Sequence, residues 1–171
     1  MPTPSKNTGA MPNKIPTGSG PAQDAISLLT EDHANVKAMF EQYESLSDRS
    51  QVSKKKLAMQ ICLELTKHAT AEEEIFYPAV REAGKDTEDL VDEANVEHAS
   101  AKDLIAQIIS MDPGDDLYDA KIKVLSEQIE HHVGEEEGEM FPKAKKAKLD
   151  LVALGEAIAA RKAEIELPLP Q

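Results

Sequence analysis

The chain has 171 residues, of which 40% are apolar but only 4% are aromatic, and it contains no tryptophan. This length suits one compact domain with a tail, and the formal net charge of −13 disfavours binding to phosphate backbones or anionic lipid headgroups. The composition therefore argues against two full domains, and we expect neither a nucleic-acid partner nor a membrane partner.

Cysteine usage and hydropathy favour a protein of a reducing compartment. Cys62 is the single cysteine, so no disulfide can form within the chain. No segment reaches the roughly 18 to 20 apolar residues of a membrane span. The first residues also lack the apolar stretch of a secretory signal. We expect a cytoplasmic location.

Residues 1–22 are rich in proline, glycine, serine and threonine and show no apolar period, which predicts a disordered N-terminal arm. Residues 23–148 carry the strong helical patterns and form the predicted domain. Residues 149–171 contain a fifth helical stretch, from Asp150 to about Glu166, followed by a short tail. Its apolar stripe is weaker, so we expect this helix to pack across the bundle end or to mediate self-association.

Four long segments place apolar residues three or four positions apart, which is the period of an amphipathic α-helix. Their inward stripes run over residues 26–43, 57–79, 91–108 and 122–140. Each stripe contains one histidine in phase with it: His33, His68, His98 and His132. The breaks "SLSDRSQVS", "EAGKDTED" and "MDPGDD" contain helix-ending and capping residues. Such short connections predict an all-α, up-down-up-down four-helix bundle.

One eleven-residue phrase occurs twice. "HATAEEEIFYP" starts at His68 and "HVGEEEGEMFP" starts at His132, and His33 and His98 are separated by a similar interval. The second pair of helices thus repeats the first as a helical hairpin. A bundle built in this way has approximate two-fold symmetry, and a site at its centre should share it.

The repeated phrases place a histidine and a glutamate four residues apart, on the same face of a helix. His68 with Glu72, and His132 with Glu136, can each offer an imidazole and a carboxylate to one centre. Two more imidazoles come from the first and third helices. Buried carboxylates are costly without counter-charges, and histidines are mostly neutral near pH 7. The pattern predicts a dinuclear metal centre bridged by the two glutamates.

The predicted metal ligands are six: His33, His68, Glu72, His98, His132 and Glu136. Two imidazoles and two bridging carboxylates give each ion four protein donors, whereas iron or manganese usually takes five or six. The shortfall leaves room for a solvent-derived bridge and for an exchangeable position that could bind O2, peroxide or NO. Imidazole and carboxylate ligands suit iron, manganese and zinc alike.

Neighbouring residues have simpler interpretations. Glu73, Glu74, Glu135 and Glu137 are expected to be solvated, His131 to lie on the surface and Cys62 to be buried as an apolar residue. Tyr43 and Tyr77 can either donate hydrogen bonds near the centre or simply pack. Pro78 and Pro142 are expected to bend or end their helices, because proline removes a helical hydrogen bond.

These phrases resemble the hemerythrin-like, HHE cation-binding family. The matching segments are "LTEDHANVKAMFEQY", "HATAEEEIFYP", "VEHASAKDLI" and "HVGEEEGEMFP", and the resemblance covers roughly residues 24–147. It implies a four-helix bundle with an oxo- or hydroxo-bridged, non-haem di-iron centre. It also implies that Glu72 and Glu136 bridge the irons, with His33 and His68 on one iron and His98 and His132 on the other.

The chain departs from the oxygen-carrying hemerythrins at two positions. Those proteins have a second histidine on the third helix, where this chain has Lys102, and their last carboxylate is an aspartate five residues after its histidine, where this chain has Glu136 at four. One iron would therefore lack a ligand, which argues against reversible O2 carriage. Lys102 is expected to extend outward or to steer anions, and Lys37, four residues after His33, repeats its placement.

Three functions fit this pattern. The leading hypothesis is a di-iron protein that binds, senses or detoxifies O2, peroxide or NO, with weak catalase-like turnover or a redox partner as further expectations. The alternative is an iron-binding or iron-buffering module without turnover. The third is a helical interaction bundle with polar histidines in its core. A ferritin-like oxidase is disfavoured, because no histidine has a glutamate three residues before it. The sequence gives no indication of the oligomeric state.

Overall fold

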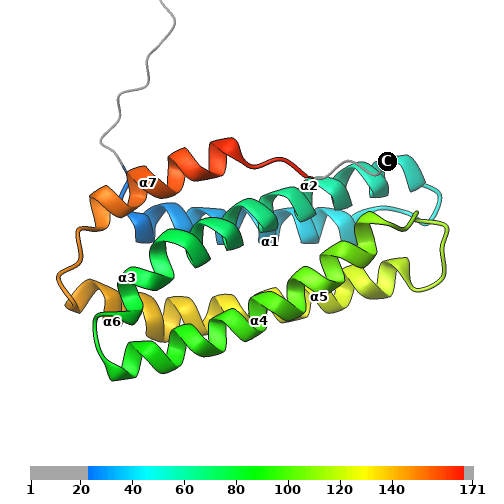
Figure 1. Ribbon diagram of the computed structural model, residues 1–171. Helices are drawn as coiled ribbons and strands as arrows, with labels where there is room; N and C mark the ends of the chain where they lie inside the picture. Colours follow the sequence, from blue (N-terminus) through cyan, green and yellow to red (C-terminus); the bar gives the residue numbers. More distant parts are fainter. Residues whose placement is uncertain (1–22, 168–171) are drawn as a thin grey trace, which may run out of the picture.

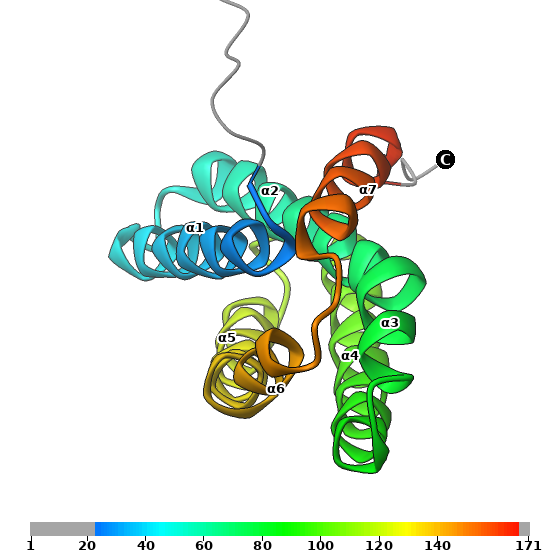
Figure 2. The ribbon, with the colours of Figure 1, turned by 90° about the vertical axis from the view of Figure 1, so that its left-hand side faces the viewer.

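A computed structural model describes residues 23–167 of the chain. Within that range the protein is helical and has no strand. The four long helices are α1 (Ala25–Ser45), α2 (Gln51–Ala71), α4 (Lys85–Ile109) and α5 (Tyr118–Glu135). Figure 1 shows that successive long helices run in opposite directions across the view, and Figure 2 shows them at the four corners of a bundle. This confirms the predicted fold. The predicted arm, residues 1–22, and the last four residues lie outside the described range.

Capping residues explain where two of the helices begin. The Asp24 carboxylate accepts a hydrogen bond from the backbone N–H of Ser27 at 2.8 Å, at the start of α1. Asp150 does the same for Ala153 at 3.0 Å, at the start of the last helix. The first two loops fall within the predicted breaks, and the third, residues 110–117, extends one residue beyond its break at each end. The hairpins α1–α2 and α4–α5 then pack against each other through α2 with α4 and α1 with α5.

The second and fourth long helices each continue through a π-turn. After α2 come η1 (Glu72–Phe76) and α3 (Tyr77–Arg81), and after α5 come η2 (Glu136–Met140) and α6 (Phe141–Lys146). The internal repeat is therefore visible even in this irregularity of the backbone. Both π-turns begin at a glutamate of the predicted metal site, and such turns are frequent at functional sites.

Pro78 and Pro142 account for the π-turns. A proline has no backbone N–H, and its ring crowds the carbonyl four residues before it. The residue before each proline bonds five residues back instead of four, so that Tyr77 N–H donates to Glu72 O and Phe141 N–H to Glu136 O. The helix widens locally and then continues. The sequence left two outcomes open, that the prolines bend their helices or that they end them. The prolines do not end these helices.

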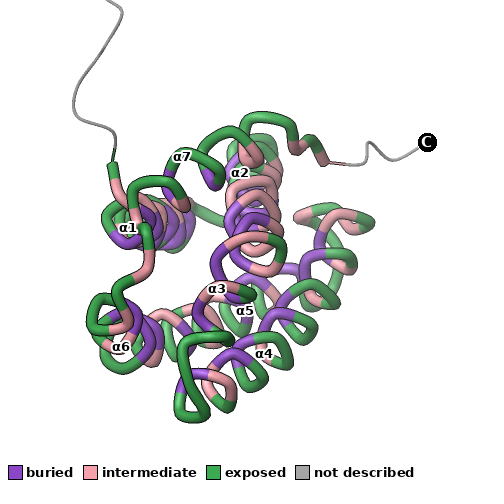
Figure 3. Tube along the Cα trace, turned by 60° about the vertical axis from the view of Figure 1, so that its left-hand side comes forward, coloured by how far each residue is buried: buried purple, intermediate pink, exposed green. Residues whose placement is uncertain are grey.

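Buried apolar residues form two clusters, one toward each end of the bundle, and they line the inner faces of the long helices (Figure 3). The first includes Phe40, Ile61, Ile105 and Leu125, and the second includes Leu29, Phe76, Val91 and Phe141. Along α1 the second cluster reaches Leu29 and the first begins at Val36. His33 lies between them. The predicted ligands thus form a polar layer between two apolar cores.

The last helix, α7 (Leu151–Glu164), lies along the side of the bundle over α1 and α2 (Figures 1 and 2). Its Ile158 is fully buried. Gly155 allows a close approach, because a Cβ there would lie 2.4 Å from the carbonyl oxygen of Gln23. The expectation that this helix packs across the bundle end is therefore wrong. None of the helices within residues 23–167 is both long and apolar enough to span a membrane.

Candidate metal centre

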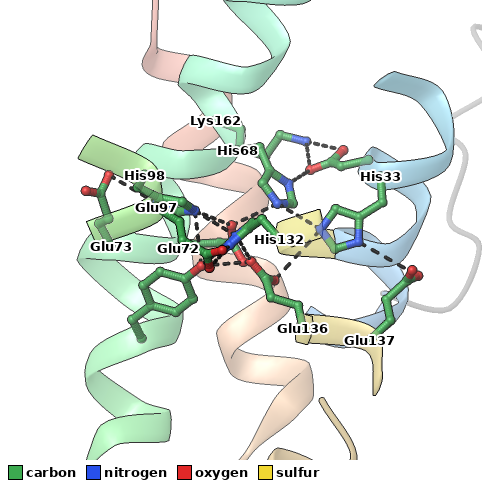
Figure 4. A network of polar contacts seen from close by, with 12 residues as sticks. His33, His68, Glu72, Glu73, Glu97, His98, His132, Glu136, Glu137 and Lys162 are labelled. Atoms are coloured by element: carbon green, nitrogen blue, oxygen red, sulfur yellow. Dashed lines mark hydrogen bonds and ion pairs between the residues drawn. The ribbon is translucent and has the colours of Figure 1, made fainter. Parts of the chain in front are cut away.

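The four in-phase histidines converge in the polar layer, one from each long helix (Figure 4). They are between 4% and 8% exposed. Their Nε2 atoms meet in two pairs, each across one hairpin. The His33 and His68 Nε2 atoms are 3.2 Å apart, and the His98 and His132 Nε2 atoms are 3.1 Å apart. The helical phase read from the sequence therefore brings all four imidazoles to one place.

The two predicted bridging carboxylates lie between these pairs. Glu72 is fully buried, and its Oε1 is 2.8 Å from His68 Nε2 and 3.5 Å from His98 Nε2. Glu136 is 1% exposed, contacts His132 Nε2, and has its Oε2 3.8 Å from the Nε2 of His33. Each carboxylate thus reaches one imidazole of each pair. Two sets of donor atoms, each lying within 4.8 Å of one another, share Glu136: Glu72, His98, His132 and Glu136 in one, and His33, His68 and Glu136 in the other.

The donor set fits cations. Within the described part of the chain, both oxygens of Glu72 and the Oε2 of Glu136 are buried and make no hydrogen bond, although His68 Nε2 lies 2.8 Å from Glu72 Oε1. Leaving buried carboxylate oxygens unpaired is strongly unfavourable in an apolar interior. Imidazole nitrogens and carboxylate oxygens are the ligands that iron, manganese and zinc accept. Bound cations would satisfy these atoms together.

Two further carboxylates hold the histidines of α2 and α5 in place. Asp32 accepts a hydrogen bond from His68 Nδ1 at 2.9 Å, and Glu97 accepts one from His132 Nδ1 at 2.9 Å. Such contacts turn the opposite nitrogen, Nε2, toward a metal and increase its basicity. Sequence reasoning missed both residues. The available signal was an acidic residue directly before His33 and directly before His98, at equivalent positions of the repeat.

Asp32 and Glu97 differ in the residues that contact them. Lys162 of α7 forms an ion pair with Asp32, with its Nζ 2.6 Å from both carboxylate oxygens. Glu97 instead has His131 Nε2 at 3.5 Å, and the side chain of His131 is 66% exposed, as expected for a surface residue. Only one half of the centre is therefore connected to α7.

An aromatic pair also breaks the symmetry. The Tyr77 hydroxyl donates to Glu136 Oε1 at 2.8 Å and lies 3.1 Å from His98 Nε2. The corresponding residue of the second repeat is Phe141, whose ring stacks on His33 with 5.8 Å between the centroids. The sequence allowed the tyrosines either to donate hydrogen bonds near the centre or simply to pack. Tyr77 donates a hydrogen bond within the centre. Tyr43 donates to Asp119, outside the centre.

Charges in the centre shift the pKa values of its groups. Burial and the charge of His68 lower the pKa of His33 to about 3. Burial works against a proton on His68, but neighbouring carboxylates, Glu72 first, raise its pKa to about 10. Burial likewise opposes a proton on His132, and Glu136 raises its pKa to about 9. Without a metal, the neighbouring carboxylates thus favour a proton on each of these two histidines.

Of the flanking glutamates, Glu74 and Glu137 are exposed, as expected, whereas Glu73 and Glu135 are half-buried. Glu73 forms an ion pair with Lys102, and its Oε2 lies 3.8 Å from His98 Nδ1. Glu74 forms an ion pair with Arg161 of α7 at 2.7 Å. These residues hold neighbouring elements together. Cys62 is fully buried, as expected.

A small cavity lies beside the four histidines. Its volume is about 30 Å³, comparable to the share of one molecule in liquid water. Apart from Asp32, Thr66, Lys102 and the histidines, its walls are apolar: Val36, Leu65, Ala69, Ala101, Ile105, Ile129 and Val133. The cavity is large enough for a molecule about the size of water.

Comparison with known proteins places this arrangement in a family. Residues 24–144 match the hemerythrin family model, described as the hemerythrin HHE cation binding domain. The chain belongs to this family. A hemerythrin HHE cation binding domain-containing protein from Mycobacterium kansasii has a similar crystal structure, with a TM-score of 0.70 and 25% sequence identity. The likeness covers 83% of this chain and 86% of the M. kansasii chain.

A second relative of this HHE domain has a different description. A DNA nickase from Nostoc sp. is 30% identical over 137 residues, which make up 78% of this chain and 37% of the nickase. The chain spans little more than a third of that relative's length. The α7 helix, which carries Lys162 and its contact with Asp32, lies after the residues matched by the family model.

Proposed function

We propose that this HHE domain holds two iron ions and uses them to bind, sense or detoxify a small oxidant, namely O2, peroxide or NO. The observation that carries the proposal is the pair of buried carboxylates, Glu72 and Glu136, each lying between imidazoles of different pairs and each with at least one oxygen that makes no hydrogen bond. The family supports cation binding, typically of iron. Manganese and zinc are the substitutes that the same ligands accept.

In this proposal His33 and His68 would hold one ion and His98 and His132 the other, and Glu72 and Glu136 would supply carboxylate oxygens to both. Bound iron would supply redox chemistry and coordination positions open to a small ligand. The cavity beside the histidines would admit the oxidant and exclude larger molecules. Its apolar walls favour a neutral ligand over an anion.

Residues around the ligands have separate roles. Asp32 and Glu97 would keep His68 and His132 in the orientation and tautomer that ligation needs. The Tyr77 hydroxyl, already directed at the centre, would donate a hydrogen bond to a ligand or to Glu136. Lys102 lines the cavity beside His98, and we propose that this is the side on which the oxidant or an electron donor approaches.

The test is metal content and an electronic spectrum of protein purified from its own host. We expect two irons per chain, an oxo-to-iron charge-transfer absorption, and a change in that spectrum on adding peroxide, O2 or NO. Glu136→Gln should lose iron, whereas Glu139→Gln, an exposed residue of the same π-turn, should not. An iron-loaded protein whose spectrum responds to none of the three oxidants contradicts the proposal.

The alternative is an iron-buffering module without turnover. The net charge of −13 favours it, because an acidic surface attracts cations. A peroxide turnover assay on the iron-loaded protein separates the two functions. Steady O2 evolution supports oxidant chemistry, whereas stoichiometric uptake and release of iron with no turnover supports buffering.

The same net charge is the reason to propose no nucleic-acid partner for this chain, despite the relative described as a DNA nickase. A DNA-binding assay at low salt tests this directly. Retention of duplex DNA by the purified chain at 50 mM salt would overturn it.

A further inference from the structure

A groove separates α1 from α5 on the outside of the bundle. Its volume is about 500 Å³. One wall is formed by residues of α1 between Thr30 and Glu44. The other is formed by residues of α5 and η2 between Ser126 and Glu137. A water molecule occupies about 30 Å³ in the liquid, so the groove is large enough for a hydrated ion. It is distinct in size and composition from the small apolar cavity beside the four histidines.

His33 lies at the inner end of this groove. It lines both the groove and the small cavity, and it is only 8% exposed. Its Nδ1 has no hydrogen-bond partner within residues 23–167 and lies 3.8 Å from Glu137 Oε1 (Figure 4). The Glu137 side chain is 40% exposed, so it faces solvent and the histidine at once. An unpaired, buried imidazole nitrogen thus faces a partly solvated carboxylate.

The groove has the charge that attracts cations. Its lining contains four glutamates, Glu41, Glu44, Glu130 and Glu137, and a single lysine, Lys37. A cleft lined mainly by one sign of charge raises the local concentration of the opposite ion and the rate at which it associates. Anions would be slowed by the same field.

Gly134 keeps the groove open. It lies in α5 and lines the groove, and a Cβ placed on it would meet no atom within 4 Å. A glycine inside a helix costs roughly 0.5–1 kcal/mol relative to alanine, so helix stability does not favour it here. A larger side chain at this position would project into the groove.

We propose that divalent cations, Fe²⁺ in particular, enter and leave the centre through the α1–α5 groove, and that Glu137 is the transient ligand that passes them to His33. This rests on the proposed metal centre and adds a route to it. Metal ions and oxidants then reach the centre by different paths. The acidic groove serves the cation, and the apolar cavity serves the neutral ligand.

The test compares the rates of metal uptake and removal in matched variants. Glu130→Gln combined with Glu137→Gln removes two charges from the groove, and Glu127→Gln combined with Glu139→Gln removes two exposed charges that do not line it. Fe²⁺ or Co²⁺ uptake by the metal-free protein would be followed by absorption at low salt, and removal would be followed with a chelator. Final metal content is measured in each case.

We expect the groove variant to take up metal on the order of tenfold more slowly than the control variant, with the same final content. Added salt should slow uptake by the unmodified protein and by the control more than by the groove variant. Gly134→Leu, which obstructs the groove without removing charge, should slow both uptake and chelation.

Equal uptake rates in the groove and control variants, with no effect of Gly134→Leu, overturn the route while leaving the centre intact. A protein that takes up no metal at all overturns the centre and the route together. Circular dichroism and the melting temperature of each variant confirm that the fold is retained, so a change in rate reports on the route.

Discussion

Two carboxylates, Asp32 and Glu97, each accept a hydrogen bond from a histidine on the neighbouring helix of the same hairpin. They contribute no ligand atom to the proposed centre, yet they determine which histidine nitrogen faces it. Their removal should therefore weaken metal binding without emptying the ligand set. At the residue scale, the centre depends on this outer layer as well as on the six ligands.

Asp32→Asn tests this outer layer. The amide cannot carry the charge that orients His68 and increases its basicity, so we expect a roughly 10- to 100-fold loss of metal affinity. Competition with a chromophoric chelator measures it. Glu31→Gln is the control. Glu31 is exposed, and within the described residues its side chain forms a hydrogen bond with Gln23 alone. Equal affinities for the two variants would show that Asp32 has no part in the centre.

Tyr77→Phe makes the first repeat resemble the second, which has Phe141 at the equivalent position. The variant removes the hydrogen bond to Glu136, so the spectrum of the metal-loaded protein and its response to peroxide should change. Tyr43→Phe removes a comparable bond to Asp119 outside the centre. Both variants should lose about 1–3 kcal/mol of stability. Only the first should alter the spectrum, and identical spectra would contradict this role.

Metal binding should depend on pH. The ordinary pKa of histidine is 6.5. In the metal-free protein burial acts to lower the pKa of His68 and His132, but the nearby carboxylates outweigh it and raise these values to about 10 and about 9. Each histidine must lose its proton to ligate, so affinity should rise from pH 6 to pH 9 with release of protons. Calorimetry in buffers of different ionisation enthalpy measures the release. An affinity independent of pH would contradict it.

The same pKa shifts make the stability of the metal-free protein fall as the pH rises, whereas metal affinity increases. A histidine whose pKa is higher in the folded state than in the unfolded state binds protons preferentially when folded. This contribution to stability is complete below pH 6.5 and is lost as the pH rises through about 9 to 10. Metal-free protein should therefore melt at a lower temperature at pH 9.5 than at pH 6.5, whereas metal-loaded protein should show less change.

At the scale of elements, α7 is the part that extends beyond the matched family domain, and it is connected to the centre through one ion pair. Lys162 contacts Asp32, which in turn contacts His68. The closeness of α7 to the start of α1 depends on Gly155, whose α-hydrogen faces the backbone of Gln23. A helix held this closely transmits small displacements to the residues it contacts.

Two glycine substitutions test this packing. Gly155→Ala would place a Cβ 2.4 Å from the Gln23 carbonyl oxygen, so α7 must move, and we expect a loss of about 1–3 kcal/mol of stability. Gly134→Ala meets open space in a helix and should instead stabilise by about 0.4–1 kcal/mol. Chemical denaturation measures both. Equal effects of the two substitutions would contradict the tight packing of α7.

At the scale of the whole molecule, the polar layer divides one bundle into two apolar clusters. Without cations, this layer places two carboxylates and four imidazoles in the middle of the core. A ligand that binds only the folded state stabilises that state by mass action. The centre should therefore contribute to the stability of the bundle as a whole, in addition to its chemistry.

Metal loading should raise the melting temperature. At a free metal concentration 100 times Kd the stabilisation is about 2.7 kcal/mol, which corresponds to roughly 5–10 °C for a domain of this size. Differential scanning calorimetry with and without a chelator measures the shift. His68→Ala should abolish most of it. A melting temperature that chelation leaves unchanged would favour the remaining hypothesis of a structural bundle with polar histidines.

The sequence was sufficient for the four helices and for the inward face on which each histidine lies, because both depend on local periodicity. Residues three or four apart share a helix face wherever that helix lies, so the spacing of His68 and Glu72 predicted a pair on one face. The internal repeat extended the same inference to the second hairpin. Both inferences concern neighbours within one helix or a duplicated pattern.

Contacts between distant segments were decided only by the tertiary structure. The hydrogen bond from His68 to Asp32, the position of Lys162 beside them and the hydroxyl of Tyr77 near His98 each join residues from different helices. Their formation depends on the separation and rotation of packed helices, which no short sequence period specifies. The side-on placement of α7 has the same origin, since its weak stripe allowed several positions and the fit of Gly155 against α1 selected one.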